Sequence, residues 1–124
     1  MQYRHFLDLK MEHGDWSSTA FSPSAALDEV WHAHLSFVDR YQRDIFALTK
    51  GAHRVIEHSP VPGPEAFDRY GAAYKAHGVR MQQRGETVDR EFWPSPASVR
   101  QNYRVSHDGD SDVHLYSDSP IQCA

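Results

Sequence analysis

The sequence predicts an all-α fold: a small helical domain with two long helices paired as an antiparallel hairpin, a short N-terminal helix and an irregular C-terminal tail. Two observations predict this arrangement. Apolar residues recur at alternating steps of three and four along residues 22–48 and 64–84, which is the spacing of one helix face. Between these segments, residues 60–64 hold three prolines and a glycine and form a rigid connector.

The short N-terminal helix is expected over residues 2–13. Tyr3, Phe6 and Leu7 are spaced so that they fall near one face of a helix. Gly14 follows directly, and a glycine at this place is typical of a helix end.

The first long helix is expected over residues 22–48. Ser22 and Pro23 form a start signal, with serine as the N-cap and proline at the first helical position. The apolar stripe that follows consists of Leu27, Trp31, His34, Val38, Tyr41, Ile45 and Leu48. Gly51 marks the end of the helix. Because Trp31 lies on this stripe, we expect its side chain to be buried.

The second long helix is expected to begin at Pro64 and to end near Gly85. Its apolar stripe consists of Phe67, Tyr70, Tyr74, His77 and Met81. In an antiparallel hairpin, counting residues from the shared end places His34 and His77 within about a turn of the same level. The sequence therefore predicts that these two imidazoles approach each other across the hairpin.

The pattern weakens toward the C-terminus, and we divide the chain into a helical domain, residues 1–97, and an acidic tail, residues 98–124. The tail is rich in Ser, Asp and His and has few apolar anchors. Such a composition is typical of a poorly ordered segment.

Composition and charge exclude several classes of protein. The net charge of -4 and the pI near 6.1 argue against a nucleic-acid-binding protein, which would carry a basic face. The single cysteine, Cys123, cannot form an internal disulfide, which is typical of an intracellular protein. No apolar run reaches the roughly 20 residues that span a bilayer, and the N-terminus has no secretory signal. We therefore expect a cytoplasmic protein without a membrane span.

Three segments together resemble one known family, and they are Phe6–His13, Ser22–Ser24 and Leu27–Leu35. The last segment contains an Asp-x-x-Trp-His-x-His-x-Leu pattern that runs from Asp28 to Leu35. Over roughly residues 3–94 the chain is similar to the glycine-rich domain-containing-protein-like family. The resemblance implies a helical module without a defined catalytic mechanism. Glu57 and Ile45 depart from the family pattern, which often has His and Cys there, and both changes remove potential metal ligands.

Asp28, His32 and His58 form a candidate metal site. Asp28 and His32 are four residues apart and therefore share a helix face. Carboxylate and neutral imidazole are ligands for zinc, iron, copper or manganese, and His53 lies in the same downstream segment as His58. His34 points nearly opposite to His32, because each helical residue turns by about 100°. The alternative interpretation is structural, with the Asp28 carboxylate orienting the His32 imidazole by a hydrogen bond.

A second candidate site is a ligand pocket between the two long helices. Its lining would combine aromatic rings with imidazoles and consists of Trp31, His34, Tyr41, Tyr70, Tyr74 and His77. Such a lining could bind a planar aromatic cofactor such as a flavin by stacking and a few polar contacts. The alternative interpretation is an ordinary core, because a stripe at helical spacing needs no ligand to explain it.

No motif in the chain indicates catalysis. The cysteine is next to the C-terminus, the glycines are scattered, and no Gly-x-Ser-x-Gly nucleophile elbow is present. The sequence therefore favours a binding or interaction module, with a small molecule or a protein as partner, over an enzyme. The two alternatives are a metal-binding protein and a binder of a planar aromatic cofactor.

Overall fold

The computed structural model describes residues 1–61 and 63–106, and these residues form helices joined by loops, without a strand. The helices are α1 (Gln2–Glu12), α2 (Ala25–Leu35), α3 (Val38–Leu48), α4 (Gly63–Arg84) and α5 (Pro96–Ser106). The predicted all-α class is therefore confirmed for the part of the chain that the structure describes.

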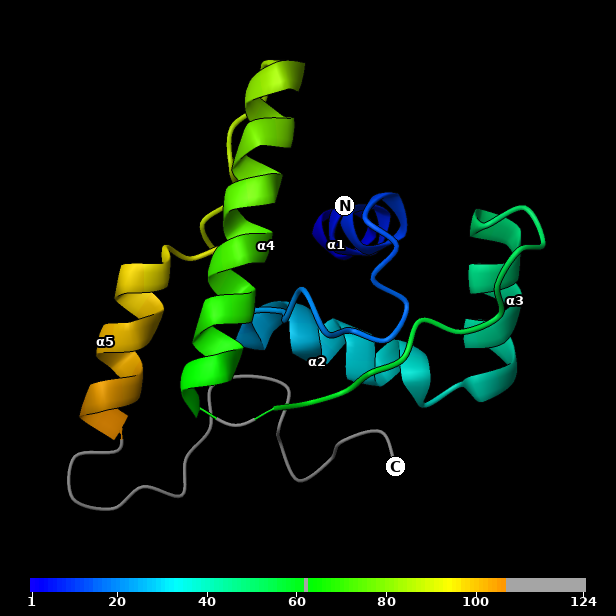
Figure 1. Ribbon diagram of the computed structural model, residues 1–124, viewed down its shortest axis with the longest axis horizontal. Helices are drawn as coiled ribbons and strands as arrows, with labels where there is room; N and C mark the ends of the chain where they lie inside the picture. The colour runs from blue at the N-terminus through cyan, green and yellow to red at the C-terminus, as the bar shows by residue number, and fades with distance from the viewer. Residues whose placement is uncertain (62, 107–124) are drawn as a thin grey trace.

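Helix α1 is the centre of the arrangement. It packs against both α2 and α4, while α3 packs on α2 and α5 packs on α4 (Figure 1). In Figure 1, α1 is seen nearly end-on, with α4 on one side of it and α3 on the other. The short N-terminal helix that the sequence predicted is confirmed, and it separates the two long segments that were expected to pair.

The core forms around α1 because one face of this helix is almost entirely apolar. Phe6 and Leu9 are fully buried, and the Phe6 ring packs edge-on against Trp31 and obliquely against Trp93. Other fully buried side chains come from α2, α3, α4 and the loop before α4, and they are Leu27, Ile45, Ile56 and Tyr70. The expectation that Trp31 is buried is confirmed.

The predicted antiparallel hairpin is wrong. Neither α2 nor α3 packs against α4 within the described residues, because α1 occupies the face of α4 that the hairpin would have used. His34 instead contacts Tyr3 of α1, and His77 contacts His5 of α1 and Trp93. The predicted approach of His34 to His77 is wrong for the same reason.

The single helix predicted over residues 22–48 is divided into α2 and α3. The chain leaves the helical path at Phe37, whose φ and ψ are -107° and 78°, and the Ser36 hydroxyl caps the His32 carbonyl at 2.9 Å. Tyr41 closes the corner, because its hydroxyl accepts a hydrogen bond from the Trp31 indole at 3.2 Å. No glycine or proline marks this break, so the apolar stripe continues through it in the sequence.

Helix boundaries elsewhere follow the predicted signals closely. Helix α2 begins after Ser24 rather than Ser22, and the Ser24 side chain accepts a hydrogen bond from the Leu27 amide as an N-cap. Helix α4 ends at Arg84, and Gly85 follows with a φ of +69°, a conformation that favours glycine.

Helix α5 crosses the predicted boundary between domain and tail. It begins at Pro96, and Val99 is buried in the common core against the rest of the domain. Part of the segment expected to be irregular is therefore helical and packed. The remainder of the predicted tail, residues 107–124, lies outside the described residues.

Within the described residues, no helix combines the length and the apolar character needed to cross a bilayer. The cytoplasmic location and the lack of nucleic-acid binding stay predictions.

Candidate metal centre

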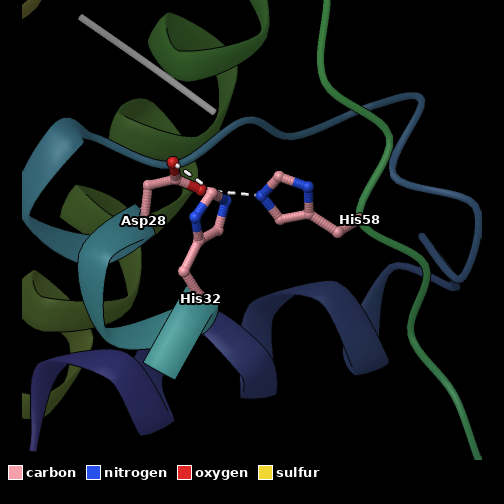
Figure 2. Close-up of side chains that lie close together, drawn as sticks. All are labelled: Asp28, His32 and His58. Atoms are coloured by element: carbon pink, nitrogen blue, oxygen red, sulfur yellow. Dashed lines mark hydrogen bonds and ion pairs between the residues drawn. The ribbon is translucent and has the colours of Figure 1, made fainter. Parts of the chain in front are cut away.

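Three side chains with metal-ligating atoms meet where α2 faces the extended chain before α4. Asp28 and His32 project from one face of α2, and His58 reaches them from the extended segment (Figure 2). One ligand atom from each residue lies within 4.8 Å of the other two. The structure therefore brings together the same three residues that the sequence predicted as a metal set.

The Asp28 carboxylate lies close to both imidazoles. His58 Nε2 is 2.7 Å from Asp28 Oδ1, which is a hydrogen-bond distance, while His32 Nε2 is 3.5 Å from Asp28 Oδ2. The rings of His32 and His58 face each other edge-on, with centroids 4.7 Å apart. The orienting hydrogen bond that the structural interpretation assigned to Asp28 and His32 is thus formed with His58 instead.

The cluster is largely shielded from water. The side chain of His58 is fully buried, and those of Asp28 and His32 are 7% and 13% exposed. His32 Nε2 is itself buried, yet it forms no hydrogen bond with the described residues. A buried polar atom without a partner costs free energy, on the order of 1–3 kcal/mol, unless a ligand or ion satisfies it.

Two buried hydrogen bonds fix the position of the His58 segment. The Tyr41 hydroxyl donates to the Ile56 carbonyl at 2.6 Å while it accepts from the Trp31 indole. The Trp31 ring also packs edge-on against His58, with centroids 4.5 Å apart. Trp31 and Tyr41, which the sequence assigned to a ligand pocket, therefore position the candidate metal ligands.

The loop between α1 and α2 holds the same segment from the other side. The Glu57 amide donates to the Trp16 carbonyl at 2.8 Å, and the Ser18 hydroxyl donates to the Glu57 carbonyl. Lys10 organises this loop, since its buried ammonium donates to Asp15, Ser18 and the Phe21 carbonyl. Burial lowers the pKa of Lys10 to about 8, against the opposing effect of Asp15.

Sequence reasoning missed the Lys10 network. Lys10 is four residues from Phe6, so helical spacing could have placed it on the buried face, where an unpaired ammonium is not tolerated. Its ammonium also lies 5.2 Å from the Phe6 ring centroid. The short polar run from Asp15 to Ser18, which follows the helix, could have indicated the hydrogen-bond partners of Lys10.

The donor set matches a small transition-metal ion. With metal–ligand distances of about 2.0–2.2 Å, two donors of a tetrahedral ion lie roughly 3.3 Å apart. One ligand atom from each of the three residues lies within 4.8 Å of the other two, so small side-chain movements would bring the donors to this spacing around an ion. Three protein ligands leave one coordination position for water or another small donor, as in zinc sites that perform chemistry.

The other histidines named with this site lie elsewhere. His53 stacks on Trp16 with ring centroids 3.6 Å apart, and His34 hydrogen-bonds to Tyr3 and Asp44. The prediction that His34 points away from His32 agrees with this placement.

The six residues of the predicted aromatic pocket fall into two groups on different sides of α1. One group is formed by Trp31, His34 and Tyr41, and the other by Tyr70, Tyr74 and His77. In the second group, His77 stacks on Trp93 at 3.9 Å, and the Tyr70 hydroxyl donates to the Pro94 carbonyl. Because these rings pack on protein side chains, the flavin-like cofactor stays a prediction without further support.

Comparisons of the chain with family models, with curated proteins and with solved structures found no match to any of them. The functional argument therefore depends on the geometry of the Asp28, His32 and His58 cluster.

Proposed function

We propose that this chain is a small metal-binding helical module, in which Asp28, His32 and His58 hold one divalent transition-metal ion. The observation that carries the proposal is the convergence of three ligand atoms within 4.8 Å in a largely buried place. Two of the ligands share a helix face, and the third is fixed by the Tyr41 hydrogen bond to its segment.

Zinc is the ion that this donor set favours. Two imidazole nitrogens and one carboxylate oxygen are typical zinc ligands, whereas magnesium and calcium prefer oxygen donors alone. Asp28 lies in the first turn of α2, where the helix dipole favours a negatively charged side chain.

The metal site suggests how a helical module of this kind would act. A module of the glycine-rich-domain-like type would use the ion to fasten α2 to the segment before α4, and the open coordination position would accept a small molecule or a partner's side chain. We therefore propose a binding function for the module rather than an enzymatic one at this site.

Elemental analysis of purified protein without a histidine tag tests the proposal. We expect close to one zinc per chain after growth with zinc, and loss of most of this metal in Asp28→Asn and His58→Gln. His13→Gln is the matched control, because His13 is exposed and lies outside the cluster, with its Nδ1 on the Leu9 carbonyl and its ring against Phe21.

The proposal fails if the wild type carries no bound metal after reconstitution and dialysis. It also fails if His13→Gln lowers the metal content as much as His58→Gln does, because the ion would then be held by scattered surface histidines. Circular dichroism of each variant shows whether the helical fold is kept.

A further inference from the structure

A hydroxyl, an imidazole and a carboxylate form a continuous relay on the side of α2 away from the metal cluster. The Tyr3 hydroxyl lies 2.7 Å from His34 Nδ1, and His34 Nε2 lies 2.8 Å from Asp44 Oδ2. The three residues come from α1, α2 and α3, so packing of all three helices assembles the relay.

The hydrogen-bond pattern assigns a role to each group. A carboxylate only accepts, so His34 Nε2 carries the proton that is donated to Asp44, and Nδ1 has the lone pair that accepts from the Tyr3 hydroxyl. This is the arrangement of an activated nucleophile: a hydroxyl, a neighbouring base, and a third group that orients the base. The edge-on contact of His34 with the Tyr41 ring, at 4.7 Å, also fixes the imidazole plane.

The relay lines a cavity of about 280 Å³. Leu7, Ala47 and Leu48 give the cavity an apolar wall, and Arg4 adds a cation. This volume lies near the lower end of the roughly 300–1,000 Å³ range of ligand pockets, so only a small ligand fits. The Arg4 side chain is held by Asp8, with Nε 2.9 Å from the carboxylate.

We propose that Tyr3, His34 and Asp44 form a nucleophilic triad that cleaves small activated carboxylic esters in this cavity. The Tyr3 oxygen attacks the ester carbonyl carbon while His34 Nδ1 takes the hydroxyl proton. The bond to the leaving alkoxide then breaks, and His34 returns the proton to it. Water next attacks the acyl-tyrosine, gives a proton to His34, and releases the acid as Tyr3 recovers its proton.

The surroundings fit this division of roles. Burial raises the pKa of the Tyr3 hydroxyl, with further contributions from Tyr41 and Asp44, so the resting group is a neutral phenol that needs a base during attack. Asp44 is partly exposed, and its Oδ2 lies 3.9 Å from Arg40 and 2.8 Å from His34 Nε2, where it orients the imidazole. The cation of Arg4 favours the negative charge that develops on the carbonyl oxygen.

Hydrolysis of p-nitrophenyl acetate by the full chain tests the triad, with p-nitrophenolate release as the first readout. We expect a rate above buffer and an acetyl group on Tyr3 when the reaction is quenched early and the peptides are analysed by mass spectrometry. Tyr3→Phe and His34→Gln should lower the rate about 100-fold or more, the size of a lost nucleophile or general base.

The Asp44→Asn variant keeps the Tyr3–His34 pair but changes the group that orients His34. We expect it to slow the reaction by about tenfold or more. Asp39→Asn is its matched control, since Asp39 is an exposed carboxylate on the same helix and should leave the rate unchanged. Repeating the assay on chelator-treated protein separates the triad from the metal cluster, because the triad needs no ion.

Two results would overturn the triad. A wild-type rate in Tyr3→Phe would show that a histidine alone hydrolyses the ester, and loss of activity on chelation would assign it to a metal-bound water. If circular dichroism shows that Tyr3→Phe does not fold, Asp44→Asn decides the question. An unchanged rate in Asp44→Asn, together with no acetyl-Tyr3 in either this variant or the wild type, contradicts the proposal.

Discussion

Two buried polar clusters of this molecule, one around Lys10 and one around Asp28, differ in how completely their hydrogen bonds are satisfied. In the first, the Lys10 ammonium uses its three donors on Asp15, Ser18 and the Phe21 carbonyl, at 2.7–2.9 Å. In the second, Asp28 hydrogen-bonds to His58, while the buried Nε2 of His32 lies 3.5 Å from Asp28 and forms no hydrogen bond with the described residues.

This difference in hydrogen bonding distinguishes a cluster that stabilises the fold from a cluster that can bind a ligand. Both oxygens of the Asp15 carboxylate are also hydrogen-bonded, because Asp15 accepts from the amides of Ala20 and Phe21 as well as from Lys10. Each charged group of this cluster is therefore paired within the protein. The Asp28 cluster, by contrast, gains interactions when a cation enters.

Replacing Lys10 by Met should cause the largest loss of stability. The change leaves the buried Asp15 carboxylate without its cation, which costs about 3–5 kcal/mol for a buried ion pair. Urea unfolding measures the loss. Lys75→Met, at an exposed position of α4, is the control and should change the free energy of unfolding by less than about 0.5 kcal/mol. Equal losses of unfolding free energy in the two variants would show that the Lys10 network does not stabilise the fold.

His77 tests whether an unsatisfied buried imidazole is enough to mark a site. Both of its ring nitrogens lack hydrogen-bond partners among the described residues, but it stacks on Trp93 and no carboxylate accompanies it. Burial, with smaller contributions from the neighbouring His5 and Arg84, lowers the pKa of His77 to about 4. We therefore interpret it as a core residue that must stay neutral.

The sign of the pH effect follows from that pKa. Between pH 6.5 and about 4 the unfolded chain binds a proton at His77 that the folded chain does not, so stability is present above pH 6.5 and is lost as the pH falls through this range. We expect a loss on the order of 1–3 kcal/mol in urea unfolding, and a flatter acid limb in His77→Leu. Identical pH profiles for the two proteins would contradict this role.

Asp28→Asn should cost about 1 kcal/mol in metal-free protein, the value of one buried hydrogen bond to His58. The loss is far smaller than that of Lys10→Met, because the amide oxygen still accepts a hydrogen bond from His58. Unfolding in the presence of a chelator measures it. A loss comparable to that of Lys10→Met would mean that the Asp28 cluster is itself a structural ion pair.

His32→Gln should have the smallest effect on the metal-free protein, below about 0.5 kcal/mol, because His32 Nε2 makes no hydrogen bond with the described residues and its approach to Asp28 is long, at 3.5 Å. The same variant should lose most of its bound zinc. Urea unfolding and elemental analysis of the same preparation give the change in stability and the zinc content. A loss of stability without a change in zinc content would contradict the assignment of His32 as a ligand.

Much of the fold was predictable because its signals are local. The short helix before Gly14, the end of α4 at Gly85 and the burial of Trp31 all follow from spacing and from glycine conformation. The break at Phe37 was not predictable, since it depends on the tertiary hydrogen bond between Trp31 and Tyr41 rather than on a helix-breaking residue.

The candidate metal set was predictable for a related reason, and its geometry was not. Asp28 and His32 share a helix face by spacing alone, but the position of His58 depends on the Tyr41 hydroxyl and the loop that Lys10 holds. The predicted hairpin is wrong because an apolar stripe indicates that a helix face is buried but does not indicate which element packs against it. Here α1 lies between the two stripes.

The most direct test of the central claim is the zinc dependence of the free energy of unfolding, measured for untagged wild type and for Asp28→Asn. Zinc at about 100 times its dissociation constant should stabilise the wild type by about 2.7 kcal/mol, because it binds the folded chain alone. The Asp28→Asn protein should gain little, and magnesium should stabilise neither protein. Equal stabilisation of the two proteins by zinc, or none of the wild type, would contradict the account.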